Sequence, residues 1–175
     1  MMTASGRPRV AIVMGSESDL ATMMETAKIL KQFGVLHEIH VASAHRTPER
    51  AAELAREAAG RGLEIFIAGA GMAHHLAGAL AANTVLPIIA VPLAASPLNG
   101  FDALLSSVQM PPGVPVAVVA IGTAGARNAA YLALQILGLS DPSVRNKLLE
   151  HRSEMAHRVE KANRNAQQQL RKLDS

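Results

Sequence analysis

The stretch SAHRT places a histidine, His45, beside an arginine, Arg46, between two hydroxyl side chains, Ser43 and Thr47. It stands where a strand-like segment ends and a helix-like segment begins. An imidazole can take up and release a proton near neutral pH. A guanidinium can grip a phosphate through two parallel hydrogen bonds. The pair therefore suggests proton transfer on a phosphorylated small molecule, and the alternative is that both are ordinary surface residues of a loop.

The composition bounds the class of protein. The chain has 175 residues, of which 49% are hydrophobic and 2% aromatic, with no cysteine. One domain with a real core is expected. So few rings argue against a base-stacking surface for nucleic acid, and no apolar run is long enough to predict a membrane span. The lack of cysteine excludes disulfides, thiolate metal sites and a cysteine nucleophile, and it fits a cytoplasmic protein.

Short apolar runs alternate with helical patterns along the chain. We predict strands at 9–15, 35–43, 63–71, 86–93 and 114–122. We predict helices at 16–34, 47–62, 72–84, 101–110 and 123–138. Such alternation with short connections is typical of an α/β fold in which a doubly wound parallel sheet carries helices on both faces.

The end of the chain differs from the rest. Residues 142–175 read as a long amphipathic helical arm, whereas residues 1–141 form a single α/β catalytic domain. Eight basic and four acidic residues lie between 145 and 175. The excess charge is read as the solvated face of a helix, with contact to nucleic acid as the alternative. The arm is expected to pack on a neighbouring subunit.

Ligands of such sheets bind beyond the carboxyl ends of the strands, close to helix N-termini that favour phosphate. Ser16 and Asp19 follow the first predicted strand, Ser43 to Arg46 the second, and Ala70 to His75 the third. Each also has an ordinary explanation, such as helix capping for Ser16 or a first-turn acid for Asp19. Their convergence on one edge of the sheet predicts a site.

The familiar binding motifs are absent or incomplete. GAGMAH resembles the dinucleotide fingerprint, but its sixth residue is His74 and no acidic residue follows at the usual distance. His74 and His75 are adjacent, so they do not form the i, i+4 pair of a zinc helix. No metal site is predicted.

The segments MGSESD, SAHRTPER, AGAGMAHHLAG, LPIIAVP and LLSSVQMPPGVPVAVVAIG occur in this order between Arg9 and Leu137. Together they closely resemble the class I 5-(carboxyamino)imidazole ribonucleotide mutases, the bacterial AIR carboxylase family of purine biosynthesis. The resemblance implies a flavodoxin-like, three-layer α/β/α sandwich. It also implies a homo-octamer in which C-terminal segments are exchanged between neighbours, and an isomerase that uses no cofactor or metal.

The implied reaction moves a carboxylate from the exocyclic nitrogen of the aminoimidazole ribonucleotide to ring carbon 4, through trapped carbon dioxide. His45 aligns with the catalytic histidine of the family and would act as general acid and base. The resemblance also implies these substrate contacts: Asp19 to the ribose with Ser16 beside it, Ser43 and Arg46 to the phosphate, and Ala70, Gly71, His75 and Leu76 around the base and carboxylate.

Three residues depart from the pattern of many members. Met72 replaces glycine, His74 replaces alanine and Ala77 replaces proline, next to the expected carboxylate pocket. Two other functions remain open at this point. One is an enzyme of a different reaction, either a class II carboxylase that uses free carbon dioxide or a related domain that acts on another heterocycle. The other is a non-catalytic nucleotide-binding module that oligomerises through its arm.

Overall fold

The computed structural model describes residues 6–173. The predicted domain and arm reach beyond these residues, to Met1 and Ser175, and those ends lie outside the described part of the chain. The strands are β1 (Val10–Met14), β2 (His37–Val41), β3 (Ile65–Gly71), β4 (Ile88–Leu93) and β5 (Ala117–Val118). The helices are η1 (Glu17–Asp19), α1 (Leu20–Gln32), α2 (Pro48–Arg61), α3 (Leu76–Ala81), α4 (Phe101–Val108), α5 (Gly122–Leu137) and α6 (Pro142–Leu173).

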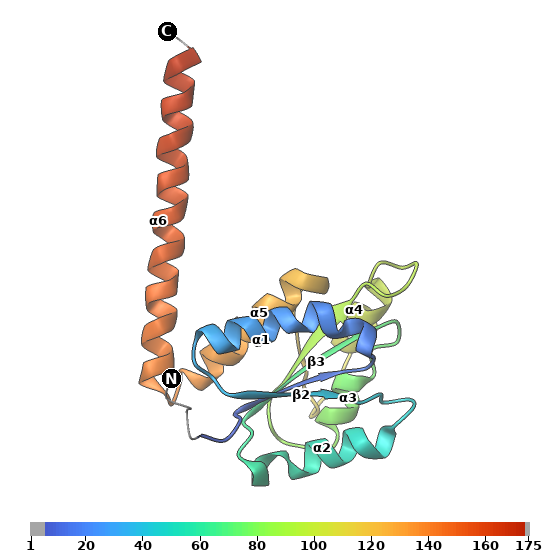
Figure 1. Cartoon of the computed structure of the whole chain (residues 1–175). Coiled ribbons are helices and arrows are strands. Elements are labelled where there is room, and N and C mark those ends of the chain that lie inside the picture. Colours follow the sequence, from blue (N-terminus) through green and yellow to red (C-terminus); the bar gives the residue numbers. More distant parts are fainter. Residues whose placement is uncertain (1–5, 174–175) are drawn as a thin grey trace. The chain divides into compact units, whose positions relative to one another are not determined.

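The strands form one parallel sheet in the order β2-β1-β3-β4-β5. Val10 of β1 is in register with His37 of β2 and with Ile65 of β3. All residues of β1 and β4 are buried, as are those of β3 before Gly71. A parallel sheet covered on both faces needs such continuous apolar strands. The predicted doubly wound α/β sandwich is therefore confirmed, with α1 and α5 on one face and α2 and α3 on the other (Figure 1).

Small side chains bring the helices close to the sheet. Ala51, Ala55 and Ala58 of α2 are buried against the face that also receives Leu76 and Leu80 of α3. Alanine favours helix and loses no side-chain entropy on burial. This face therefore packs tightly with little loss of conformational entropy.

The opposite face is tied by polar and aromatic contacts between α1 and α5. The hydroxyl of Thr26, which is fully buried, donates a 2.7 Å hydrogen bond to the carbonyl of Ala126. The rings of Phe33 and Tyr131 meet edge to face, with centroids 6.0 Å apart. These contacts join α1 to α5 on this face of the sheet.

The connections from β1 and β3 leave the sheet in opposite directions. The chain passes from β1 to β2 on one side of β1, and from β3 to β4 on the other side of β3. A crevice opens at such a switch in strand order, outside the carboxyl ends of the strands. The same edge therefore receives the turns at residues 15–19, 42–47 and 71–75.

Two elements fall furthest short of their predicted length. The predicted helix 72–84 is α3 only from Leu76 to Ala81, because Met72 adopts a left-handed φ of 54° and the chain up to His75 is irregular. The fifth predicted strand retains only Ala117 and Val118, which pair with β4 at the edge of the sheet.

The described residues group into two compact units, 6–133 and 134–173. The second unit contains the end of α5 and the long helix α6. Asp141 caps α6, because its carboxylate accepts hydrogen bonds from the backbone N–H and the hydroxyl of Ser143. A helical tail is thus present, whereas the predicted division of the chain at residue 142 stays a prediction.

Close packing at the end of β3 requires glycine at position 71. A Cβ added to Gly71 would lie 2.3 Å from the Cβ of Ala95 and 3.1 Å from the carbonyl oxygen of Leu93. We expect Gly71→Ala to lower the free energy of unfolding by about 1–3 kcal/mol, measured by urea denaturation. The control is Gly60→Ala in α2, where a Cβ meets nothing within 4 Å and a gain of up to about 1 kcal/mol is expected. Equal effects of the two changes would contradict this packing argument.

Candidate active site

A cavity of about 560 Å³ opens at the carboxyl ends of β1, β2 and β3. Most of the substrate contacts predicted from the sequence line it, as follows: Ser16, Asp19, Ser43, His45, Arg46, Ala70, Gly71 and Leu76. Gly15, Ser18, Ala44, Met72, Ala73 and Ala95 complete the lining. The structure thus brings the predicted residues to one place, while their roles remain predictions.

The two hydroxyl residues of SAHRT close a turn on themselves. The hydroxyl of Thr47 accepts a 2.9 Å hydrogen bond from the backbone N–H of Ser43, and the N–H of Thr47 donates to the carbonyl of Ser43 at 2.8 Å. Thr47 precedes α2 but its side chain does not cap the helix. Ser43 Oγ accepts the backbone N–H of Arg46 at 3.2 Å. This turn holds His45 and Arg46 at the rim of the cavity.

Arg46 reaches from the β2 turn to the end of β1. Its guanidinium donates a 3.0 Å hydrogen bond to the carbonyl of Gly15. Ser16, the next residue, caps the short helix η1 by accepting hydrogen bonds from the N–H and hydroxyl of Ser18. A phosphate placed here would meet a fixed guanidinium and two hydroxyl side chains, Ser16 and Ser43.

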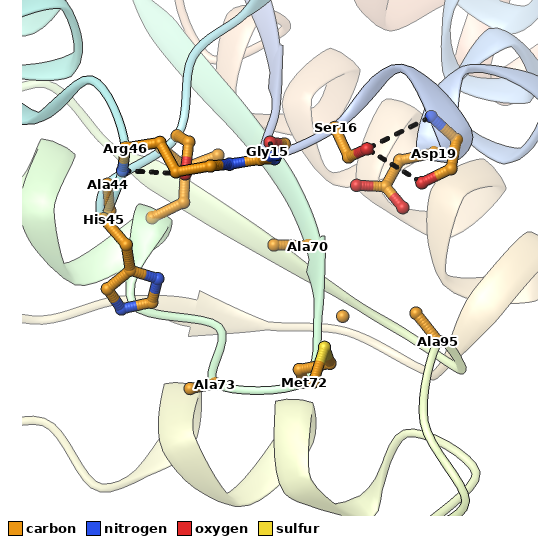
Figure 2. A pocket seen from close by; sticks show the side chains of 14 residues that line it. Gly15, Ser16, Asp19, Ala44, His45, Arg46, Ala70, Met72, Ala73 and Ala95 are labelled. Carbon is orange, nitrogen blue, oxygen red and sulfur yellow. Dashed lines mark hydrogen bonds between the residues drawn. The ribbon is translucent and has the colours of Figure 1, made fainter.

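Asp19 is the one buried carboxylate of the cavity lining, with 7% of its surface exposed. Burial raises the pKa of Asp19 above its ordinary value of 3.8, while the Ser16 backbone and the positive charge of Arg46 oppose the shift. In Figure 2 this carboxylate and the imidazole of His45 lie at opposite sides of the view, with Ala70 and Met72 between them. The cavity therefore has an acidic side and a basic side.

His45 is paired with His75. Nε2 of His45 lies 2.7 Å from Nδ1 of His75, and the rings meet at 69° with centroids 4.8 Å apart. Both side chains are exposed. Because Nε2 of His45 is occupied by this contact, Nδ1 is the ring nitrogen that can meet a ligand in the cavity. His75 does not line the cavity itself, but its ring contacts the ring of His45, which does.

The turn from Gly71 to His75 holds the features that sequence reasoning missed. Met72 is 61% exposed and has a left-handed backbone conformation that residues other than glycine rarely adopt. His74 is buried and contacts Ser107 of α4, 33 residues away. A buried histidine next to an exposed one has no signature in sequence, because the pairing partner is set by tertiary packing.

Among residues 6–173 there is no group of three or more histidine, aspartate or glutamate side chains that could hold a metal ion. In the same part of the chain no helix combines the length and the apolar character that crossing a membrane requires.

Residues 9–158 match the family model described as AIR carboxylase. The chain belongs to the AIR carboxylase family. It is 55% identical to the N5-carboxyaminoimidazole ribonucleotide mutase of Pyrococcus horikoshii over 156 residues, which is 89% of this chain and 87% of that protein. It is 51% identical to the mutase of the same name from Pseudomonas aeruginosa, over 86% of this chain and 92% of that protein.

Solved structures of PurE proteins share the fold. The crystal structure of PurE from Treponema denticola aligns with a TM-score of 0.78 and 32% identity, covering 87% of this chain and 94% of that one. A substituted PurE2 from the same organism gives a TM-score of 0.79 at 30% identity, covering 88% and 94% of the two chains. The family resemblance and the flavodoxin-like fold expected from the sequence are both confirmed.

Replacing the buried carboxylate of Asp19 by an uncharged side chain should stabilise the folded protein near neutral pH. Burial disfavours the charged form of Asp19, so the folded state carries a cost that grows as pH rises through the raised pKa of this group. We expect Asp19→Asn to unfold at higher urea concentration than wild type at about pH 7.5, and the difference to vanish below the unfolded pKa of about 3.8. The control is Glu17→Gln on the exposed neighbour. A gain for Asp19→Asn that persists at low pH would contradict desolvation as its cause.

Proposed function

We propose that this protein catalyses the N5-carboxyaminoimidazole ribonucleotide mutase reaction of purine biosynthesis, as a class I member of the AIR carboxylase family. The observation that carries the proposal is that one cavity combines a group for proton transfer, His45, with a group for phosphate binding, Arg46. The relatives that are 51–55% identical carry the same mutase name.

Binding places the ribonucleotide between the two sides of the cavity. The phosphate binds at Arg46 and Ser43, with Ser16 close by, and the ribose hydroxyls bind at the carboxylate of Asp19. The aminoimidazole then lies against the backbone of Ala70 and Gly71, at the end of β3. The desolvated carboxylate of Asp19 supports this assignment, because a buried acceptor without full solvation gains from a hydroxyl donor.

His45 acts first as a general acid and then as a general base. In the first step the nitrogen–carbon bond of the carbamate breaks, its electrons go to the nitrogen, and protonated His45 supplies the proton that the nitrogen takes up. In the second step carbon 4 of the aminoimidazole attacks carbon dioxide, and His45 takes the proton that carbon 4 loses. The residue ends in its starting state, so the reaction needs no other acid or base.

Retention of carbon dioxide is the second requirement, because a molecule released into solvent reacts far more slowly than one held beside the ring. The end of the cavity formed by Gly71, Met72, Ala73 and Ala95 is apolar and suits an uncharged, linear molecule. The side chain of Met72 enlarges this apolar lining relative to the glycine of many family members.

The same proposal includes a homo-octamer and a cytoplasmic location. Residues 152–173 of α6 are exposed throughout, and Val159, Leu170 and Leu173 among them are apolar. A second subunit would cover such side chains, as expected for an arm that packs on a neighbour. The location follows from the substrate, because a charged ribonucleotide is made and used inside the cell.

The decisive experiment offers the purified protein two substrates. We expect freshly made N5-carboxyaminoimidazole ribonucleotide to be converted to its carbon-4 isomer, and aminoimidazole ribonucleotide with bicarbonate to react slowly. His45→Asn should lower the first rate by about 100- to 10,000-fold, the usual contribution of a positioned acid and base. His37→Asn, outside the cavity, is the matched control.

The outcomes separate the alternatives. A faster reaction with bicarbonate would replace the mutase with a carboxylase of class II type. Failure of both substrates would leave a nucleotide-binding module.

The assembly is checked independently of catalysis. Light scattering coupled to gel filtration should give eight times the mass of the 18.4 kDa chain. Removal of residues after Leu149 should give a smaller assembly, because the exposed apolar side chains of α6 would be lost. A monomer of the full chain would contradict the proposed octamer.

A further inference from the structure

His74 is buried and lies outside the cavity lining, next in the chain to Ala73, which belongs to that lining. Its side chain is 1% exposed, and its Nδ1 lies 2.9 Å from the hydroxyl oxygen of Ser107, which is 2% exposed. Ser107 belongs to α4, whereas His74 belongs to the turn between β3 and α3. The contact therefore joins two elements that are separate in the chain.

The hydrogen bonds assign the proton on the His74 ring. The hydroxyl of Ser107 donates to the carbonyl of Ala103 at 2.7 Å, so its oxygen is left to accept from Nδ1–H of His74. Nε2 of His74 is buried and has no hydrogen-bond partner among the described residues. An unpaired buried acceptor is tolerated more often than an unpaired buried N–H. Both arguments give the tautomer with hydrogen on Nδ1.

The backbone of the same residue is held by the neighbouring serine. The N–H of His74 donates a 2.9 Å hydrogen bond to Ser106 Oγ. Two adjacent hydroxyl groups of α4 therefore hold the main chain and the ring of one residue. We call the contact of the His74 ring with Ser107 the buried clamp.

The turn that the clamp holds is unfavourable on its own. Met72 has a φ of 54°, and the N–H of His75 donates to the carbonyl of Ala73 in a tight turn centred on His74. Strained backbone of this kind persists only where surrounding contacts over-determine it. The side chain of Met72 is largely exposed, so the fixing contacts come from His74 rather than from Met72.

We propose that His74 and Ser107 are positioning residues for the reaction, acting by fixing the turn that keeps Nδ1 of His75 against Nε2 of His45. The proposal rests on the proposed mutase function for its kinetic effect. Its physical content is that His75 follows His74 directly, so a change in the His74 ring or backbone moves the partner of His45. His74 does not touch the substrate.

The clamp is also uncharged under working conditions. Burial lowers the pKa of His74 to about 4, and the neighbouring His75 adds to the shift. A neutral ring anchors the turn without placing a second positive charge beside the pair that carries the proton. The family resemblance described above gives alanine at position 74 in many members, and an alanine side chain could not make the contact with Ser107.

Two substitutions of His74 by amide side chains of similar polarity, asparagine and glutamine, distinguish a specific role of the clamp from a general effect on packing. Asparagine at position 74 places an N–H near the site of Nδ1, whereas glutamine places its N–H near the site of Nε2. We expect His74→Gln and Ser107→Ala to lower kcat by about 10- to 100-fold with little change in KM, because misplacement of a proton-transfer group affects the chemical step. His74→Asn should retain kcat within about threefold.

The control is Thr26→Val, which removes another buried hydroxyl that bonds to a carbonyl, between α1 and α5. It should lower the unfolding temperature and leave kcat unchanged. A merely structural role for the clamp predicts instead that His74→Gln and Ser107→Ala behave like Thr26→Val. Equal loss of kcat in His74→Asn and His74→Gln would also overturn the proposal.

Nitrogen NMR of the imidazole groups tests the geometry without any substrate. Wild type should show His74 with hydrogen on Nδ1 at neutral pH, and Ser107→Ala should lose that preference. Hydrogen on Nε2 in wild type would overturn the clamp. If the tautomer is as expected but wild type has no mutase activity, the clamp stands and the proposed function fails.

Discussion

The parallel register of β2, β1 and β3 is the constraint on which the site depends. Because β1 pairs with both neighbours in the same direction, the carboxyl ends of three strands meet at one edge. The chain leaves β1 and β3 on opposite sides, so a cavity can open between their turns. β1 and β3 are buried and consist of apolar residues and glycine, whereas β2 at the edge of the sheet is part-buried or exposed. The turns carry small, polar and strained residues.

Two of the three turns at this edge close through their own short-range hydrogen bonds. Ser43 and Thr47 bond to each other, and Ser16 caps the helix that follows β1. Self-contained turns of this kind leave the side chains between them free for a ligand. A long-range hydrogen bond from Arg46 to the Gly15 carbonyl ties the turn after β2 to the end of β1.

The third turn works differently because its backbone is strained. Met72 would be easier to accommodate as glycine, and the segment holds its shape through contacts with α4. In the proposed arrangement His75, held by this turn, presents its Nδ1 to Nε2 of the exposed His45. In this proposal the buried contacts of His74 with α4 orient the exposed pair of His75 and His45.

The sequence by itself determined the alternation of strands and helices, the parallel sheet and the cluster of candidate residues at its edge, because these follow from hydrophobic periodicity and from motifs continuous in the chain. It placed His45, Arg46 and Asp19 correctly at one edge. Only the tertiary structure decided that β5 is short, that helix α3 begins at Leu76, and that His74 turns inward to Ser107 while His75 turns outward. The contact of His74 joins residues 33 positions apart in the chain, and a buried partner at such a distance leaves no local pattern.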